Sequence, residues 1–107
     1  MPRLSGNNIW AYRGETIPIE VTVYDADGNP VTNIDLAKFA YRQGEVKEHK
    51  QCTIDGAVVS VLFSESETLS MDGSYTYEIR VKLGDEVESM VIGRLTIEAG
   101  VIISAMT

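Results

Sequence analysis

The acidic loop at residues 25–29 is the stretch whose residue types come closest to a metal site. It reads D-A-D-G-N, and Ca²⁺ prefers the carboxylate and carbonyl oxygens that such a loop supplies. A calcium-binding EF-hand loop, however, needs glycine at its sixth position and a bidentate glutamate at its twelfth. Counted from Asp25, Gly28 stands fourth and Leu36 stands twelfth. The same residues are dense in turn formers, so we predict a turn between two strands and no metal site.

A second group of acidic side chains comprises Glu65, Glu67 and Asp72. Paired carboxylates can perform acid–base catalysis when burial separates their pKa values. This segment is rich in serine and has no flanking aromatic cleft, so we interpret the carboxylates as solvated surface charges. Its start, Ser64-Glu65-Ser66-Glu67, is a capping-box pattern that predicts one helical turn.

The chain contains no recognisable sequence motif for nucleophilic catalysis or cofactor binding. Cys52 is the single cysteine and His49 the single histidine, which excludes an internal disulfide. We interpret Cys52 as a small buried hydrophobic residue; the alternative, a reactive thiol, needs an activating neighbour. There is no nucleophile elbow, glycine-rich phosphate loop or metal-ligand spacing. We therefore predict that the protein is not an enzyme and binds no cofactor.

Length and charge narrow the possible partners. A chain of 107 residues has the size of one domain, and we predict a single domain over residues 1–107. The formal net charge of -7 disfavours nucleic acid and anionic membranes, whose phosphates repel an acidic protein. No apolar run approaches the roughly 18 residues of a membrane span, so we predict no membrane insertion. The first six residues lack the apolar region of a signal peptide, so we expect synthesis and folding in the cytoplasm.

The elements that would position any site are strands, and the clearest lies at residues 75–83. Tyr75, Tyr77, Ile79, Val81 and Leu83 alternate with polar residues, the pattern of a half-buried strand in an antiparallel sheet. A tyrosine two residues after Gly73 also suggests a tyrosine corner, whose hydroxyl bonds to nearby backbone. We expect that bond within residues 69–72.

Similar patterns predict further strands along the chain. One covers residues 16–24, and Pro18 places it at a sheet edge because proline cannot donate a ladder hydrogen bond. Asp55-Gly56 predicts a hairpin between residues 51–54 and 57–63. Leu36, Ala37, Ala40 and Tyr41 fit a helical face, but with strands on both sides we predict a strand at residues 38–42. Residues 44–50 are predicted as a charged connection and residues 87–98 as the last long strand, with a bulge or close backbone contact at Gly93.

These elements predict an all-β, immunoglobulin-like antiparallel β-sandwich of about seven strands. The predicted core has aliphatic residues from several strands. It consists of Ile19, Val21, Val59, Val61, Tyr75, Ile79, Val81, Leu95 and Ile97.

Two apolar terminal segments are the candidate partner contacts. Neither is needed to complete seven strands, and exposed apolar segments usually mark contacts. The candidate residues are Ile9, Trp10, Tyr12, Val101, Ile102 and Ile103. We expect a homo-oligomer or a partner complex that uses one of these segments; the alternative is that both fold back onto their own sandwich.

Four motifs occur in a fixed order along the chain. An Arg-Gly-acidic-Thr entry at residues 13–16 is followed by a D-x-D-G-x-P turn at residues 25–30. A glycine–tyrosine entry follows at residues 69–77 and a V-x-G-x-L-x-I strand at residues 91–97. In this order they resemble small tail and baseplate-associated proteins of phages and prophages, especially the N-terminal domain of baseplate upper proteins.

The resemblance implies a non-enzymatic structural or assembly module of a phage or prophage tail or baseplate. Such a module is made in the bacterial cytoplasm, ends in the tail of the virion, and contacts copies of itself or other tail proteins. The alternative is a carbohydrate- or protein-binding immunoglobulin-like module of a bacterial surface protein. An exposed row of aromatic residues would favour this alternative, and Trp10, Tyr12, Tyr24 and Tyr41 are its candidates.

Overall fold

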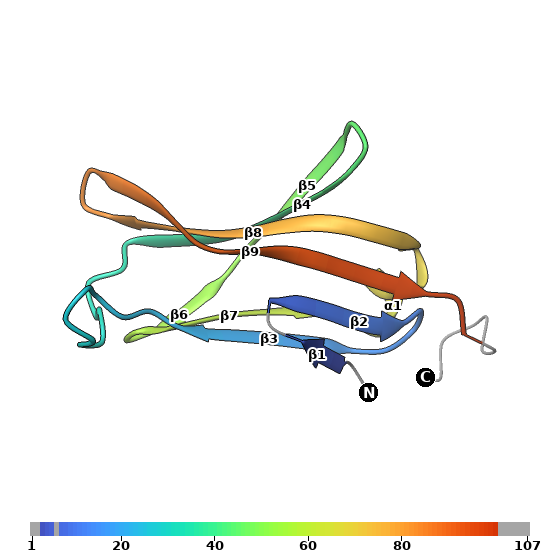
Figure 1. The fold of residues 1–107 in the computed structure, drawn as a ribbon, viewed down its shortest axis with the longest axis horizontal. Helices are drawn as coiled ribbons and strands as arrows, with labels where there is room; N and C mark the ends of the chain where they lie inside the picture. The colour runs from blue at the N-terminus through green and yellow to red at the C-terminus, as the bar shows by residue number, and fades with distance from the viewer. Residues whose placement is uncertain (1–2, 6, 101–107) are drawn as a thin grey trace.

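Two stacked β-sheets enclose the core of the domain (Figure 1). The computed structural model describes residues 3–5 and 7–100, and for residues 3–5 it describes the backbone alone. The strands are β1 (Arg3–Ser5), β2 (Asn8–Tyr12), β3 (Ile17–Thr22), β4 (Leu36–Gln43), β5 (Val46–Gln51), β6 (Thr53–Asp55), β7 (Val58–Phe63), β8 (Gly73–Leu83) and β9 (Glu86–Glu98). A six-stranded sheet has the order β1–β2–β9–β8–β4–β5, and a three-stranded sheet has the order β3–β7–β6.

The predicted all-β character is confirmed, and the described strands outnumber the predicted seven. The one helix among the described residues is α1 (Glu65–Leu69). No helix in the described part of the chain has the length and apolar character needed to cross a membrane.

The predicted charged connection at residues 44–50 is wrong, because most of it forms β5. This strand pairs antiparallel with β4 from Gln43↔Val46 to Lys38↔Gln51. Almost all of its side chains are exposed, since the β4–β5 hairpin extends beyond the three-stranded sheet (Figure 1). A strand with neither face buried shows no apolar alternation, so its sequence lacks the pattern that marks a half-buried strand.

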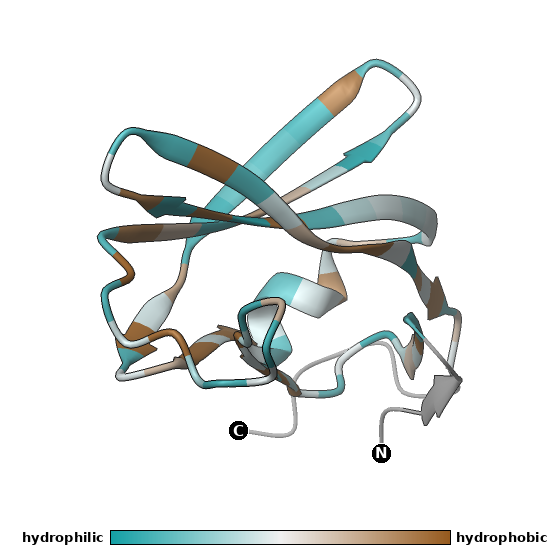
Figure 2. Cartoon of the chain, turned by 60° about the vertical axis from the view of Figure 1, so that its left-hand side comes forward, coloured by the Kyte–Doolittle hydropathy of each residue, from teal (hydrophilic) through white to brown (hydrophobic). Residues whose placement is uncertain are grey.

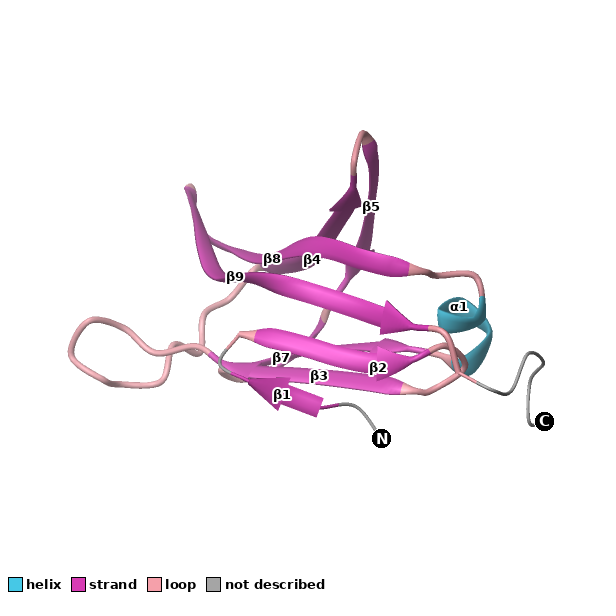
Figure 3. Ribbon diagram, turned by 45° about the vertical axis from the view of Figure 1, so that its right-hand side comes forward, coloured by secondary structure: helices cyan, strands magenta, loops and turns pink. Residues whose placement is uncertain are grey.

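The N-terminal strand β2 adds to the edge of β9 in the same direction. Ile9 pairs with Leu95 and Ala11 with Ile97 in a parallel register, so the six-stranded sheet is mixed rather than purely antiparallel. The sheet curls at this side, and β2 and β1 descend toward β3 (Figure 3). Ile9 is only 4% exposed, so this terminal segment folds back onto its own sandwich.

The central strand β8 has the predicted alternation. Tyr77, Ile79 and Val81 are buried, while Thr76 and Arg80 are exposed. Of the predicted core, Val21 and Tyr75 are only partly buried and the other seven residues are buried. Tyr75 lies near the strand's start, where the backbone N–H of Asp72 donates to its hydroxyl over 3.1 Å, as the tyrosine-corner pattern predicts.

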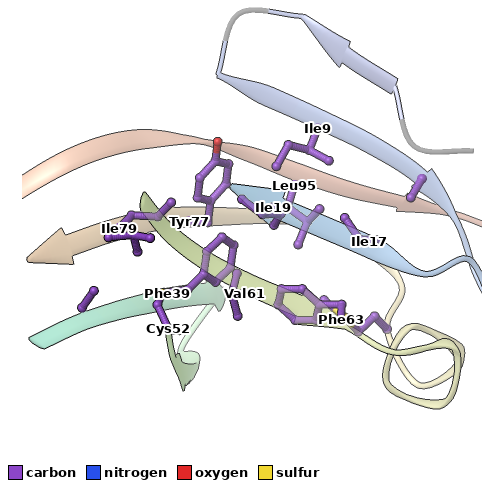
Figure 4. Packing of buried hydrophobic residues seen from close by; sticks show 14 of the residues in the cluster. Ile9, Ile17, Ile19, Phe39, Cys52, Val61, Phe63, Tyr77, Ile79 and Leu95 are labelled. Atoms are coloured by element: carbon purple, nitrogen blue, oxygen red, sulfur yellow. The ribbon is translucent and has the colours of Figure 1, made fainter. Parts of the chain in front are cut away.

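The core is aromatic at its centre (Figure 4). Phe39 stacks on Tyr77 with ring centroids 5.0 Å apart and meets Phe63 edge-on at 5.4 Å. Cys52 is buried beside these strands, and burial raises the pKa of its thiol, which disfavours the nucleophilic thiolate. Its placement agrees with the interpretation of Cys52 as a core residue.

Gly93 lies against the chain that enters β2. A Cβ atom at this position would stand 2.2 Å from the carbonyl oxygen of Asn7, closer than real contacts allow. The same oxygen accepts a hydrogen bond from the hydroxyl of Tyr77 at 2.5 Å. The predicted close backbone contact at Gly93 is confirmed, and the register shift between β8 and β9 falls instead between Ile79 and Arg80.

The capping-box helix α1 lies at one end of the sandwich. Ser64 and Glu67 satisfy each other's backbone N–H groups, as the sequence predicts. The fully buried residue of this helix is Thr68, whose hydroxyl donates to the carbonyl oxygen of Glu15 at 2.8 Å and accepts from the N–H of Gly14 at 3.1 Å. The helix therefore anchors the loop that leads into β3.

Candidate functional site

The acidic loop at residues 25–30 is a turn. One carboxylate oxygen of Asp25 accepts the backbone N–H groups of Asp27 and Asn29, both at 2.9 Å. Gly28 has a φ of 83°, which glycine adopts without strain. In the described part of the chain, no group of three or more His, Cys, Asp or Glu side chains is arranged to hold a metal.

Two of the three carboxylates at residues 65–72, those of Glu67 and Asp72, form ion pairs within the domain. Asp72 forms an ion pair with Arg13 at 2.8 Å. Glu67 forms one with Lys50 at 2.5 Å, and the same ammonium donates to the carbonyl oxygen of Leu62. Burial alone would raise the pKa of Glu67, but the hydrogen bonds from Lys50 and Ser64 outweigh it and hold the pKa below its ordinary value. These partners leave no separated acid–base pair.

The outer face of the six-stranded sheet is the surface whose composition departs most from the rest of the chain. Strand register and alternation place residues from β2, β4, β5, β8 and β9 on it. We call this surface the basic face. It consists of Asn8, Trp10, Tyr12, Leu36, Lys38, Ala40, Arg42, Lys47, His49, Gln51, Ser74, Thr76, Glu78, Arg80, Lys82, Val87, Ser89, Ile92, Arg94, Thr96 and Glu98.

The basic face is hollowed. The β4–β5 and β8–β9 hairpins rise from the sheet and splay apart, as Figures 1 and 2 show. Three open hollows lie along it: one around Ala40, Thr76 and Ile92, a second that includes Trp10 and Arg94, and a third around Ala40 and Val87. Ala40 lines two of them, so the first and third adjoin.

Positive charge is concentrated on the basic face. The chain has nine lysines and arginines, and six of them lie here: Lys38, Arg42, Lys47, Arg80, Lys82 and Arg94. Of the sixteen acidic residues, strand register places only Glu78 and Glu98 on this surface, and Glu48 also lines its first hollow. A protein whose net charge is -7 therefore presents one locally cationic side.

Most of these cations form no ion pair among the residues that the structure describes. Arg80 pairs with Glu78 at 2.7 Å, and Ser89 also donates to Glu78. The Ser89 hydrogen bond contributes most to lowering the pKa of Glu78; burial opposes it and Arg80 assists it. The other five cationic side chains form no salt bridge with any residue that the structure describes. Unpaired cations can bind a negatively charged partner without first breaking an internal bond.

Apolar side chains lie among these charges. Ile92 is 59% exposed and Val87 is 60% exposed, and both line hollows of the basic face. The half-buried Trp10 lines the hollow that also contains Arg94. Apolar residues surrounded by charges are typical of protein–protein interfaces.

The opposite surface, the outer face of the three-stranded sheet, has the reverse charge. Its register places Glu20 opposite Ser60 and Asp55 opposite Val58, all pointing outward. We call it the acidic face; it consists of Pro18, Glu20, Thr22, Thr53, Asp55, Val58, Ser60 and Leu62. None of these strand residues is a lysine or arginine, and Leu62 is 53% exposed.

The predicted contact residues fall in different places. Trp10 and Tyr12 lie on the basic face, with Tyr12 opposite Glu98. Ile9 is buried in the core, so it offers no surface to a partner in this fold. Val101, Ile102 and Ile103 lie outside the described residues.

The aromatic residues proposed for a carbohydrate platform do not form one row. Tyr41 points inward, with its ring 5.3 Å from that of Phe63 and 5.9 Å from that of Tyr75. Trp10 and Tyr12 belong to β2, on the other side of β8 and β9 from β4. The structure therefore separates Tyr41 from the two aromatic residues of the basic face.

Comparison with known proteins adds no family: no protein-family model matches the chain, and a search of curated proteins finds no match.

Proposed function

We propose that this domain is a non-enzymatic structural and assembly module that docks onto protein through its basic face. The observation that carries the proposal is the gathering of unpaired cations and exposed apolar side chains on one hollowed side of an acidic domain. Apolar contact would supply most of the affinity, and the cations would select an acidic surface and orient it.

A protein partner fits this surface better than nucleic acid does. The ionised Glu78 lies in the middle of the basic face and would repel phosphates. Fourteen of the sixteen acidic residues surround the face on the rest of the chain, which opposes the approach of a long polyanion. An acidic protein surface would avoid both problems, because its charges are local and can face individual cations.

The setting that the order of the sequence motifs suggests is the tail or baseplate of a phage or prophage. A tail component assembles with copies of itself or docks to a ring of other proteins. Both tasks need a stable domain with a surface that binds protein. The two-sheet core supports a stable domain, and the basic face offers cations and exposed apolar side chains to a partner.

The test is deletion of the gene from its native genome, followed by complementation. Particles are counted by electron microscopy and scored for complete tails. We expect the deletion to yield incomplete tails and wild-type protein to restore them. Lys38→Gln/Arg42→Gln protein, which lowers the charge of the basic face by two, should fail to restore them.

The matched control is Thr32→Glu/Asn33→Glu, which changes net charge by the same amount on an exposed loop away from this face. It should restore complete tails as wild type does. Complete tails after deletion, or equal restoration by both variants, would refute the proposed function.

A further inference from the structure

The basic and acidic faces lie on opposite sides of the sandwich and point away from each other (Figure 1). Each combines exposed apolar residues with charge of one predominant sign. On the basic face Ile92 and Val87 lie among lysines and arginines; on the acidic face Leu62 lies with Glu20 and Asp55. The two surfaces of one molecule are thus complementary to each other.

We propose that the domain associates head to tail with copies of itself, the basic face of one copy docking on the acidic face of the next. This inference rests on the proposed assembly function and names the partner. It goes beyond contacts through the terminal segments, because it uses two sheet faces, and of the predicted terminal contacts only Trp10 and Tyr12 belong to one of them.

Charge placement favours head-to-tail association over a two-fold dimer. A symmetric dimer through the basic face would bring two surfaces of net positive charge together, and like charges repel. The head-to-tail contact instead places these cations opposite Glu20 and Asp55. Because a contact between two different faces leaves one of each unused, it propagates into a stack or closes into a ring.

Purified protein tests the inference through charge reversal. Lys38→Glu/Arg42→Glu reverses charges on the basic face, and Glu20→Lys/Asp55→Lys reverses those on the acidic face. All four residues are exposed, so the fold should tolerate the changes, and circular dichroism melts verify this. Sedimentation velocity measures association over a range of concentrations.

We expect wild-type protein to form species larger than one chain that grow with concentration. Each double variant alone should sediment as a monomer. Lys38→Glu/Arg42→Glu lowers the net charge of the basic face from +4 to about zero, and Glu20→Lys/Asp55→Lys gives both faces positive charge. The quadruple variant, which carries all four reversals in one chain, should regain association because positions 38 and 42 of one copy and positions 20 and 55 of the next again have opposite charge.

A monomeric wild type at high concentration overturns the inference. So does a quadruple variant that stays monomeric, or a Glu20→Lys/Asp55→Lys variant that associates as wild type does. If one double variant fails to fold, Ile92→Ser or Leu62→Ser replaces it as the disruptive change on the same face, and loss of association is again expected.

The two proposals fail separately. Suppose that wild-type protein is monomeric and that Lys38→Gln/Arg42→Gln protein fails to restore tails. The proposed docking function is then still supported, and the proposal that the partner is a second copy is refuted. Suppose instead that the quadruple variant regains association and that tails are complete after gene deletion. Self-association is then supported, and the proposed role in tails is refuted.

Discussion

Lys50 and Glu67 join the projecting β4–β5 hairpin to the capping-box helix through an ion pair of 2.5 Å. The ammonium also lies 4.7 Å from the ring centroid of Phe63, so its charge faces the edge of the aromatic core. The pair connects a strand of one sheet to the helix that follows the other. It therefore helps to fix the orientation of the hairpin that borders the basic face.

The first prediction concerns the pH dependence of this ion pair. The pKa of Glu67 is lower in the folded state than its ordinary value of 4.5, so the ionised group stabilises the fold above that value. The contribution disappears as the pH falls through the folded-state pKa. Because the Glu67 side chain is 42% exposed, solvent screening limits the effect to about 0.5–1 kcal/mol.

Thermal melts of wild type and Glu67→Gln check this prediction. Glutamine keeps the capping box and removes the charge. The variant should melt below wild type at neutral pH, and the two should converge in acid. Glu45→Gln, at the exposed hairpin turn, is the control and should match wild type throughout; a Glu67→Gln difference that persists unchanged in acid would contradict the ionic explanation.

The second prediction compares two valines with opposite environments. Val81 is 1% exposed in the core and Val87 is 60% exposed on the basic face. Val81→Ala should cost about 1–3 kcal/mol in urea unfolding, from lost burial and the cavity left behind. Val87→Ala should cost less than about 0.5 kcal/mol. Equal costs would refute the assignment of the two faces of the β8–β9 pair.

The third prediction concerns the contact at Gly93. An added Cβ would collide with the carbonyl oxygen of Asn7, the acceptor of the Tyr77 hydroxyl, and backbone cannot yield as a flexible side chain does. Gly93→Ala should therefore cost about 1–3 kcal/mol in urea unfolding. Gly100→Ala is the control, since its Cβ would meet only ordinary contacts with Tyr12 at 3.7 Å. Wild-type stability in Gly93→Ala would show that the chain at Asn7 moves away readily.

The fourth prediction is that calcium does not stabilise the domain. The Asp25 carboxylate already accepts two backbone N–H groups of its own turn. Addition of calcium, or of EDTA, should leave the melting temperature unchanged in differential scanning fluorimetry. A rise of several degrees with calcium would identify a metal site that the turn geometry conceals.

The sequence predicts strands best where one of their faces is buried. Residues 75–83 alternate because one side packs on Phe39 and its neighbours and the other meets water. The strand β5 has no buried face and gave no such signal. The parallel pairing of β2 with β9 joins segments far apart in the chain, and no local pattern specifies such a contact.

The basic face, too, could be predicted only in part from the sequence. The outward positions of β8, including Arg80 and Lys82, follow from alternation along one strand. Their grouping with Lys38, Lys47 and Arg94 depends on which strands are neighbours and in which register. The net charge of the whole chain does not indicate the basic face, because the acidic residues elsewhere outnumber its lysines and arginines.

The central claim, that the basic face of one copy meets the acidic face of the next, is tested most directly by site-specific cross-linking. Ile92→Cys protein is mixed with Leu62→Cys protein, both in a Cys52→Ala background, and a short bis-maleimide is added. We predict a cross-link between position 92 of one copy and position 62 of the other, in excess over 92–92 and 62–62 products. No 92–62 product, or mainly 92–92 product, would contradict the claim.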